Sequence, residues 1–581
     1  MPYDVIVGRD EGDKKLFGKR GLVFIGKSYV TMGQYTSLSN PIYLDVARSH
    51  VIMVSGKRGC LAGETLVFTD KGYKDIKNFN TKEDKILSFN KESKQFEWEN
   101  AELLEYLIEN EELFEITFEN NKKLILTREH PLLLSNGEQL ITLLWVEAEK
   151  LKEGDCILSV GKSNDDLIPL KIDSIKKVNN VNRVYDLSVS KNHSFIANGV
   201  VSHNSGKSYS IGAIAEAICT LPYEDAQNIC SLMFDTMGIF WTMKFKNDKD
   251  KALLDDWGLK AQNVPVRIFA PFGYFSDYKD KGIPVDHEFA IKISELEADD
   301  WTSIFNLGFT DDIAVLIEDV ISKLKEKESY GFDDIKSMIR SKDASDDLKN
   351  STIALFDAAK TWGFFSEEKG TKISEMIAPG QSTIIDLSMY SSIGTFNVRA
   401  LIISIVCKKL FNERMNARRN EEIQAVQHGI DYLHFKPTRD MPLVWIFIDE
   451  AHEFLVKDGK TPASDALIQL LREGRQPGLS LVLATQQPGK IHTDAMTQAD
   501  VVISHRVTAK PDLEALNEIM QSYLYEGIKT KLDNLPKLKG SAIILDDNSE
   551  RIYPCRIRPR FTWHGGEAPS AVRIDKDIGI L

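Results

Sequence analysis

Two distant stretches of the chain carry the two halves of one phosphate-binding motif. The motif G-x-x-x-x-G-K-[ST] uses glycines for a tight turn whose backbone N–H groups face phosphate oxygens, and a lysine that reaches the same oxygens. The first half consists of Gly56, Lys57, Arg58 and Gly59, and the second half of Ser205, Gly206, Lys207 and Ser208. Neither half is the motif alone, so a complete loop requires the removal of residues 60–204.

The residues at the ends of this intervening segment have the chemistry to remove it. The thiol of Cys60 can accept the acyl group of Gly59, which turns the peptide bond into a thioester. The hydroxyl of Ser205 can attack that thioester, and Asn204 can cyclise onto its own carbonyl and cut the chain before Ser205. Because proximity brings these groups to reaction, no cofactor is expected for the excision.

Four separated sequence blocks resemble the splicing blocks of inteins. They are Cys60-Leu-Ala-Gly-Glu-Thr, Thr127-Arg-Glu-His130-Pro, Val184-Tyr-Asp186-Leu through His193-Ser-Phe-Ile-Ala-Asn-Gly-Val, and Val201-Ser-His203-Asn204-Ser205. The resemblance implies an all-β domain of the Hint type over residues 60–204. The stretch between the second and third blocks is too short for a homing endonuclease, so a mini-intein is expected.

The same resemblance assigns roles to the polar residues inside the segment. Thr127 and His130 are expected to polarise the amide at the first junction and to protonate its nitrogen. Asp186 corresponds to the residue that takes part in the same early steps. The imidazoles of His193 and His203 are the expected proton-transfer partners when the terminal asparagine cyclises.

The joined loop predicts a nucleotide site with a second, acidic part. Lys207 is expected to contact the β- and γ-phosphates of ATP, and Ser208 to bind Mg²⁺. The apolar run at 443–448 ends in Asp449 and Glu450. At the end of a buried strand, Asp449 is expected to bind Mg²⁺ through water, and Glu450 to act as the base that orients the attacking water.

The elements that must position these residues alternate between apolar runs and helical patterns. Strands are predicted at 50–55, 230–235, 382–387, 443–448, 479–485 and 501–504, and helices at 208–220, 396–420 and 463–473, with an acidic, helix-patterned stretch at 294–359. This alternation predicts an α/β fold with a parallel sheet. Residues 1–49 instead show short β-like runs and predict a small β module.

The chain without its inserted segment resembles the HerA and FtsK group of ring-forming ATPases, and HerA-like proteins in particular. The resemblance rests on the joined loop and on Pro379-Gly-Gln-Ser-Thr-Ile-Ile-Asp-Leu-Ser388, Ile448-Asp-Glu-Ala-His-Glu-Phe-Leu455, Arg472-Glu-Gly-Arg475, Ala484-Thr-Gln486-Gln-Pro488 and Arg556-Ile-Arg-Pro-Arg560. It implies a RecA-like P-loop core, ATP and Mg²⁺ as cofactors, a homo-hexamer, double-stranded DNA as partner, and a nuclease partner. The N-terminal module is shorter than the family's HAS barrel, which is where the nuclease partner docks in the family.

The HerA resemblance also implies further site residues. Gln486 would sense the γ-phosphate, and Arg475 would act as an arginine finger on a neighbouring subunit, with a surface salt bridge as its alternative. Asp235, at the end of a predicted strand, would help at the magnesium site. The basic residues Arg556, Arg558 and Arg560 would either clamp an adjoining subunit or be solvated, and the sequence does not decide between these.

Composition fits a soluble protein of several domains. The chain has 581 residues, 43% hydrophobic and 27% charged, with a net charge of −14, which argues against a surface that coats nucleic acid. Its six cysteines show no metal-ligand spacing. No apolar run is long enough to span a membrane and no leader is evident, so a cytoplasmic location without membrane partners is expected.

The predicted division of the chain is an N-terminal β module at 1–49, a first part of the ATPase core at 50–59 and 205–295, the mini-intein at 60–204, a helical insertion at 296–364, a second part of the core at 365–550, and a C-terminal brace at 551–581. The leading hypothesis is a precursor that splices itself into a HerA-like, ATP-driven DNA translocase or helicase. The alternatives are a motor that moves or remodels protein complexes, as in secretion and conjugation, and a nucleotide-regulated scaffold. The unspliced chain is expected to bind ATP weakly.

Overall fold

The chain folds into two compact units. The computed structural model describes residues 3–32, 35–56, 61–81, 83–90, 95–107, 113–127, 130–135, 143–148, 151–160, 167–178, 183–189, 194–203, 208–308, 310–327, 329–390, 397–427, 439–505, 535–536, 538 and 540–565. The first unit combines residues 1–55 with 207–506 and 516–565, and the second unit is centred on residues 56–206. The segment predicted to be excised thus belongs to a compact unit of its own.

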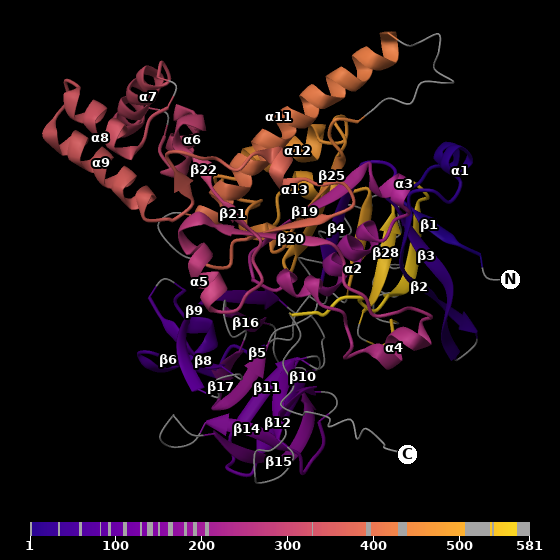
Figure 1. Ribbon diagram of the computed structural model, residues 1–581. Helices are drawn as coiled ribbons and strands as arrows, with labels where there is room; N and C mark the ends of the chain where they lie inside the picture. Colours follow the sequence, from indigo (N-terminus) through magenta and orange to yellow (C-terminus); the bar gives the residue numbers. More distant parts are fainter. Residues whose placement is uncertain are drawn as a thin grey trace. The chain divides into compact units, whose positions relative to one another are not determined.

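A large sheet forms the first unit, and its central part is parallel (Figure 1). The parallel strands, in spatial order, are β27 (Val501–Ser504), β4 (Val51–Ser55), β26 (Leu479–Thr485), β25 (Leu443–Ile448), β19 (Ile229–Asp235), β24 (Ser382–Asp386), β20 (Val266–Pro271) and β21 (His287–Phe289). The prediction of an α/β fold with a parallel sheet is therefore confirmed. The sequence pattern did not predict β20 and β21, because Arg267 interrupts the apolar run of β20 and β21 has only three residues.

Antiparallel strands continue the same sheet beyond β27. They are β28 (Ser541–Asp546), β29 (Arg551–Ile557), β2 (Leu22–Met32) and β3 (Tyr35–Asp45), with β1 (Val5–Val7) parallel to β3. Within the predicted N-terminal β module, residues 22–32 form the single long strand β2. Its register shifts near Gly26, where an added Cβ would lie 2.4 Å from the backbone oxygen of Arg556, so only glycine allows β29 to approach this closely.

Helices cover the sheet and also form a group of their own. The longer ones are α2 (Ser208–Cys219), α6 (Ala298–Ile304), α7 (Asp312–Leu324), α8 (Phe332–Ser341), α9 (Asp346–Lys360), α11 (Val398–Gln427) and α12 (Ser464–Glu473). The shorter ones are α1 (Glu11–Phe17), α3 (Tyr223–Ala226), α4 (Lys251–Asp256), α5 (Phe275–Asp280), α10 (Ile373–Met376) and α13 (Thr493–Thr497). Among the described residues, no helix is long and apolar enough to cross a membrane.

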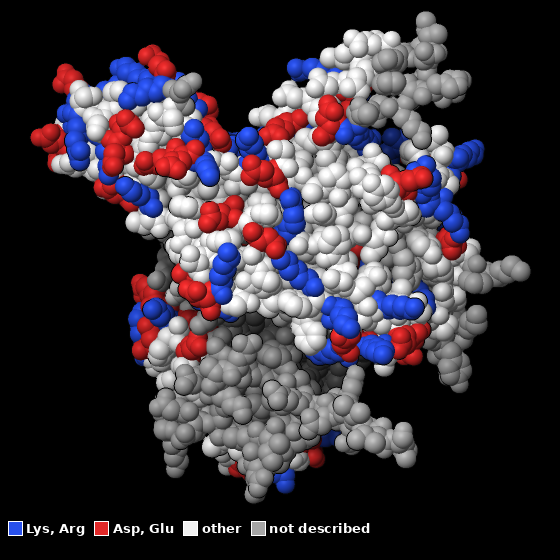
Figure 2. Space-filling view, viewed as in Figure 1, with Lys and Arg blue, Asp and Glu red and all other residues white. Residues whose placement is uncertain are grey.

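The predicted helical stretch forms the group α6 to α9, which projects from one side of the first unit (Figure 1). Its core is the fully buried Trp301, whose ring lies 4.9 Å from that of Phe356 and 5.8 Å from that of Phe305. On the outer surface of this group, acidic and basic side chains are interspersed (Figure 2). Aromatic contacts of this kind add to the apolar burial that stabilises the helical group.

The second unit is built from antiparallel strands. In spatial order they are β13 (Leu143–Glu147), β12 (Pro131–Ser135), β14 (Cys156–Val160), β15 (Leu167–Val178), β10 (Leu113–Phe118), β11 (Lys123–Thr127), β5 (Leu61–Ala62), β16 (Arg183–Val189), β9 (Gln95–Leu107), β8 (Lys85–Asn90), β6 (Leu66–Thr69), β17 (Ser194–Ala197) and β18 (Val200–His203), with β7 (Gly72–Asp75) beside β6. The last strand, β18, also pairs with β12 and β14. The sheet therefore curls back on itself around one apolar core.

The basic residues after β29 are bound inside the first unit. Arg558 and Arg560 are fully buried, and their guanidinium groups lie 3.2 Å and 2.7 Å from the carboxylate oxygens of Glu216 on α2. Backbone N–H groups of Phe561 and Thr562 donate to the same carboxylate. Burial opposes ionisation of Glu216, but Arg560 and Arg558 hold its pKa below the usual value. Neither a solvated role nor a clamp on another subunit, the two roles considered from the sequence, fits these two arginines.

Replacing Glu216 with alanine is expected to destabilise the first unit by about 3 to 5 kcal/mol, because it leaves two buried guanidinium groups unpaired. Urea unfolding followed by tryptophan fluorescence measures this change. The matched control is Asp465→Ala, which removes an exposed ion pair with Lys460 and should change the midpoint little. Equal midpoints for the two variants would contradict a stabilising role of the buried ion pairs that Glu216 forms with Arg558 and Arg560.

His50, which precedes β4, is a second buried charged group. Its Nδ1 atom lies 2.6 Å from Asp500, and its Nε2 atom lies 3.6 Å from Asp45. Burial by itself would lower the pKa of His50, but Asp45 and Asp500 outweigh it and raise the pKa to about 9. The folded chain therefore holds a proton on this imidazole over a pH range in which the unfolded chain releases it.

Stability from His50 should be fully present below about pH 6.5 and be lost as the pH rises through 9, because the folded-state pKa is the higher one. The loss is on the order of 3 kcal/mol. Unfolding free energies at pH 6 and pH 9.5 test this. In a His50→Gln variant the decline between the two pH values should be smaller, and an equal decline would refute the assignment.

Candidate functional site

The carboxyl ends of three neighbouring parallel strands bring the predicted nucleotide residues to one edge of the sheet. Strand β26 lies between β4 and β25, with Thr485 opposite Ser55 and Leu483 opposite Ile448. Ligands of open α/β sheets bind at this edge, where the strands end and the loops begin. The residues that follow β26 therefore lie beside the strand that leads into the first half of the phosphate loop, and the residues that follow β25 lie one strand further along the same edge.

Asp449, Glu450 and Gln486 meet at this edge and are almost fully buried, with 2%, 6% and 2% of their surface exposed. The Gln486 side-chain amide donates a hydrogen bond to the Glu450 carboxylate. An Asp449 oxygen accepts the backbone N–H of Glu450 at 2.9 Å. The structure thus brings together three residues that the sequence had placed on two separate strands.

The backbone at Glu450 adopts a left-handed conformation, with φ of 50° and ψ of 44°. Non-glycine residues rarely adopt this conformation, and they do so mainly where the surroundings impose it, often at functional sites. It turns the chain sharply from β25 into the short 3-10 helix Ala451–Glu453. The turn keeps the Glu450 carboxylate at the sheet edge, where it contacts Gln486.

Three buried polar atoms near this edge have no hydrogen-bond partner among the described residues. They are Gln486 Oε1, Gln487 Nε2 and Thr236 Oγ1. Buried polar groups are rarely left unsatisfied, and such groups at a sheet edge indicate a place for water, an ion or a ligand. The carboxylate, amide and hydroxyl groups at this edge offer oxygen atoms, which are the ligands that Mg²⁺ requires.

His505 connects the two sides of the split phosphate loop, and sequence analysis did not identify it. Its backbone N–H donates to the Ser55 carbonyl at 2.8 Å, and its Nε2 atom lies 2.8 Å from the hydroxyl of Ser210 in the first turn of α2. Its Nδ1 atom faces the Ser541 carbonyl at 3.0 Å, so Nδ1 carries the proton and Nε2 accepts from Ser210. The only sequence signal was a polar residue directly after the run 501–504.

The first unit therefore holds both anchors of the loop. Gly56 directly follows β4, and Ser208 begins α2. The other members of the motif, Lys57, Arg58, Gly59, Ser205, Gly206 and Lys207, lie outside the described residues. Because β4 and α2 pack in one apolar core that includes Val54 and Ile211, their relative position is set by the fold of the unit.

Asp235 and Arg475, the two remaining predicted residues of the nucleotide site, lie in different surroundings. Asp235 is fully buried, and its oxygens accept the backbone N–H groups of Met237, Gly238 and Phe240 at 2.8 to 3.1 Å. Burial and the neighbouring Asp386 raise the pKa of Asp235 to about 8. Asp235 thus holds the turn after β19.

Arg475 is exposed and donates to the carbonyl of Gln498 at the end of α13. Its guanidinium group is therefore held at the surface of the first unit. An exposed guanidinium group of this kind is available to a second molecule.

In the second unit, the strand that follows Cys60 lies between the strands of two predicted splicing residues. Leu61 pairs with Leu126 of β11 on one side and with Tyr185 of β16 on the other. The next residues along β11 and β16 are Thr127 and Asp186, with 2% and 0% of their surface exposed. The register thus brings these two side chains to the sheet positions that flank the start of β5.

The other end of the segment reaches the same turn. Strand β18 ends at His203 and pairs with β12, with Leu132 opposite Ser202. Strand β12 begins directly after the fully buried His130, whose backbone N–H donates to the Thr127 carbonyl at 3.0 Å. This hydrogen bond between His130 and Thr127 therefore connects the strand beside the first junction to the strand beside the second. Cys60, His193, Asn204 and Ser205 lie outside the described residues.

The two units define two classes of protein, a parallel α/β unit with a buried acidic edge and an antiparallel β domain whose first and last strands, β5 and β18, pair with the neighbouring strands β11 and β12. Residues 66–204 match the family model of the intein splicing domain. This match confirms the prediction of an intein within the chain. Solved structures that resemble this region include a DnaB intein from Synechocystis sp. PCC 6803, at 21% identity, and the DnaX mini intein from Spirulina platensis, at 28%. Each covers 25% of this chain and 99% of its own, with a TM-score of 0.22.

Part of the chain is similar to HerA. It is 25% identical over 216 residues to the DNA double-strand break repair helicase HerA of Pyrococcus furiosus, which is 35% of this chain and 38% of that protein. It is 31% identical over 96 residues to the probable HerA of Methanocaldococcus jannaschii, which is 16% of this chain and 19% of that protein. The matches thus span less than two thirds of either relative. The chain thus carries an intein splicing domain and is similar to HerA over part of its length.

Replacing Thr127 with alanine is expected to slow thioester formation at the first junction about 100-fold, because one group that stabilises the tetrahedral intermediate is lost. The rate of thiol-induced cleavage before Cys60, measured in an Asn204→Ala background, isolates this step. The matched control is Thr69→Ala, which removes a buried hydroxyl that bonds the Gly72 carbonyl at 2.7 Å in the β6–β7 turn. A Thr127→Ala chain that cleaves as fast as this control would refute the role.

Proposed function

We propose that the chain is a precursor that excises residues 60–204 by protein splicing, and that the ligated remainder is a HerA-like, ATP-driven DNA translocase. One observation carries the proposal. The first unit holds the end of β4 and the start of α2 together through His505, although residues 60–204 interrupt the loop between them. Excision then joins two anchors that are already in place, so the ligated loop needs no refolding of the sheet.

The splicing steps use only groups of the chain. Cys60 Sγ attacks the Gly59 carbonyl carbon, which forms a thioester and frees the Cys60 nitrogen as an amine. Ser205 Oγ attacks the thioester and releases the Cys60 thiol. The Asn204 side-chain nitrogen then attacks its own backbone carbonyl carbon, forms a succinimide and breaks the Asn204–Ser205 bond. The freed Ser205 amine finally takes the acyl group from its own oxygen, which leaves a normal Gly59–Ser205 amide.

The register of the second unit supports these roles for the internal residues. Thr127 and Asp186 flank the start of β5, where they can stabilise charge on the first scissile carbonyl. His130, at the turn between the two junction strands, can deliver a proton to the leaving nitrogen. His203 precedes Asn204 on β18 and can serve the cyclisation.

The spliced loop would bind ATP together with Mg²⁺. Lys207 and Ser208 would bind the phosphates and the ion, and Mg²⁺ when bound neutralises charge on the transferred phosphoryl group. Glu450, fixed by Gln486 and by its left-handed backbone, is positioned to orient the attacking water. The strand order β27-β4-β26-β25-β19, with the strand of Gln486 between those of the loop and of Glu450, supports the RecA-like assignment.

The movement of DNA and the ring are inferred from the HerA-like part of the chain. The HerA relatives are described as DNA double-strand break repair helicases. Arg475 is exposed, which is a requirement for an arginine finger that acts on the nucleotide of a neighbouring subunit in a homo-hexamer. The carboxylates at the sheet edge would act on the nucleotide of their own subunit, whereas Arg475 would act on the nucleotide of the neighbouring subunit. Hydrolysis would therefore need two subunits.

The Glu450→Gln exchange tests the proposed motor. The intact chain should yield a ligated product that lacks residues 60–204, detected by mass spectrometry with the excised segment as a separate species. The ligated protein should hydrolyse ATP, faster with double-stranded DNA, and Glu450→Gln should lower turnover at least 100-fold without weakening ATP binding, because only the base is lost.

Two further chains serve as comparisons for this test. Glu473→Gln, a matched exchange of an exposed carboxylate on α12, should keep full turnover. A Cys60→Ala, Asn204→Ala chain cannot splice and should bind ATP weakly, because its loop stays interrupted. Persistence of the full-length chain would refute splicing, and hydrolysis that DNA does not stimulate would favour a protein-remodelling motor.

A further inference from the structure

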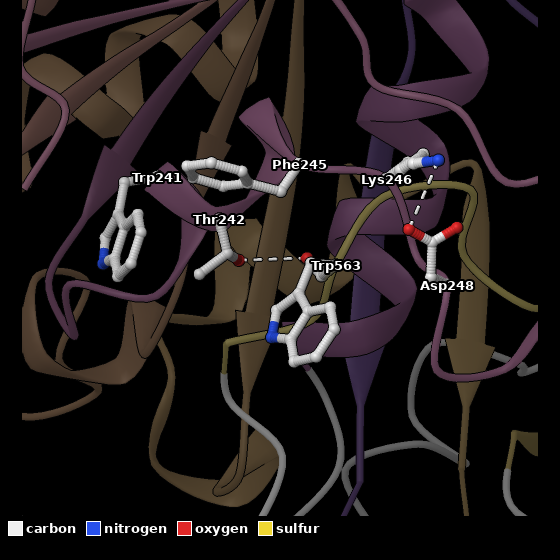
Figure 3. Close-up of a pocket in the computed structure, with 6 residues that line it drawn as sticks. All are labelled: Trp241, Thr242, Phe245, Lys246, Asp248 and Trp563. Carbon is white, nitrogen blue, oxygen red and sulfur yellow. Dashed lines mark hydrogen bonds and ion pairs between the residues drawn. The ribbon is translucent and has the colours of Figure 1, made fainter. Parts of the chain in front are cut away.

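An aromatic pocket of about 470 Å³ lies between the 3-10 helix Phe240–Lys244 and the segment after β29 (Figure 3). Six described residues line it: Trp241, Thr242, Phe245, Lys246, Asp248 and Trp563. None of them takes part in the loop or in the acidic edge described above. This volume lies in the range of pockets that bind small molecules.

The pocket presents flat aromatic surfaces to the solvent on a rigid frame. Phe245 and Trp563 have 49% and 41% of their surface exposed, and the rings of Trp241 and Phe245 pack edge-on at 6.1 Å. The Thr242 hydroxyl donates to the Trp563 carbonyl at 3.0 Å and accepts the Gly565 backbone N–H at 3.0 Å. These bonds fix the two walls relative to each other, so the aromatic faces are preformed.

The wall that carries Trp563 is continuous with the start of α2. The next residue, His564, packs its ring edge-on against the ring of Tyr209 at 5.2 Å, and Tyr209 directly follows Ser208. The Tyr209 hydroxyl also accepts the backbone N–H of Arg560 at 2.9 Å. The ion pair between Arg560 and Glu216 then holds this segment on α2. The pocket therefore adjoins the helix whose N-terminus would bind phosphate groups.

The opposite wall leads to the same edge of the sheet. The 3-10 helix that carries Trp241 follows β19, and the Asp235 carboxylate fixes the turn between them by accepting the Phe240 backbone N–H at 2.8 Å. At the rim, Lys246 and Asp248 form an ion pair at 3.4 Å. The charged side chains of Lys246 and Asp248 thus pair with each other. The remaining surface of the pocket is mainly aromatic.

We propose that this pocket binds the purine base of the nucleotide whose phosphates occupy the ligated loop. The inference rests on the proposed ATPase function and adds the residues that would recognise the base. A purine is flat and aromatic, and stacking on aromatic side chains is a general way in which proteins bind bases. If the phosphates of a nucleotide bind at the start of α2, a pocket beside that point can hold its base.

Binding of ATP and of inorganic tripolyphosphate to the ligated protein separates the base site from the phosphate site. Trp241→Ala and Trp563→Ala should each weaken ATP binding about tenfold or more, because a stacking partner is worth about that factor. Binding of tripolyphosphate, which has no base, should not change. Trp563→Phe keeps an aromatic face and should restore most of the ATP affinity.

A matched pair of phenylalanines provides the control. Phe245 lines the pocket and Phe272 does not, and both have 49% of their surface exposed. Phe245→Ala should weaken ATP binding without affecting tripolyphosphate, and Phe272→Ala should affect neither. Since Phe245 is half exposed, its replacement decides the question even if a tryptophan variant loses both ligands through misfolding.

The possible results distinguish the base site from the proposed ATPase function. Unchanged ATP affinity in the pocket variants, with tripolyphosphate bound normally, would refute the base site and leave the phosphate loop intact; this is also the result expected if an apolar segment of a protein occupies the pocket. Failure of the unmodified ligated protein to bind either ligand would instead refute the proposed ATPase function, and the base site with it.

Discussion

The position of β4 in the middle of the large sheet is the constraint on which both units depend. This strand is hydrogen-bonded on both sides, to β26 and β27, and every residue from Val51 to Ser55 is buried. The chain leaves the sheet after β4 and returns at α2, and His505 contacts both points. An insertion between them is compatible with this sheet only if its own two ends lie close together. The second unit fits that requirement, because its first and last strands, β5 and β18, pair with β11 and β12, which the hydrogen bond between Thr127 and His130 connects.

Charged groups inside the first unit fix the elements around this point. Glu216 holds the segment after β29 on α2, and His50 connects the start of β4 to Asp500. Apolar packing alone would permit small shifts of a helix over a sheet, whereas a buried ion pair with several hydrogen bonds allows one arrangement. The arrangement that results is the one in which the start of α2 lies beside the end of β4. The helix also acquires the Tyr209–His564 contact that connects it to the aromatic pocket.

The carboxyl edge of the sheet departs from the rule that buried polar groups are satisfied. Gln486, Gln487 and Thr236 each keep one buried polar atom without a partner among the described residues, and Glu450 has a left-handed backbone. The buried carboxylate of Glu216 on α2, by contrast, has several partners. Unmet hydrogen bonds and a strained residue at one edge are what a site for a polar ligand would show before the ligand binds.

The amino-acid sequence by itself determined the parallel α/β class, the strands with continuous apolar runs, the intein and the residues of both motifs, because these depend on local patterns and on residue types in fixed order. It did not reveal β20 and β21, whose runs are short or mixed, or the helix α1, whose start depends on the Asp10 side chain bonding the Asp13 backbone N–H. Only the tertiary structure decided that Arg558 and Arg560 are buried against Glu216, that His505 connects the two sides of the loop, and that Trp241 and Trp563 form one pocket. These residues are separated by hundreds of positions, and their contacts follow from the packing of β29 and α2 on one sheet, which no local pattern encodes.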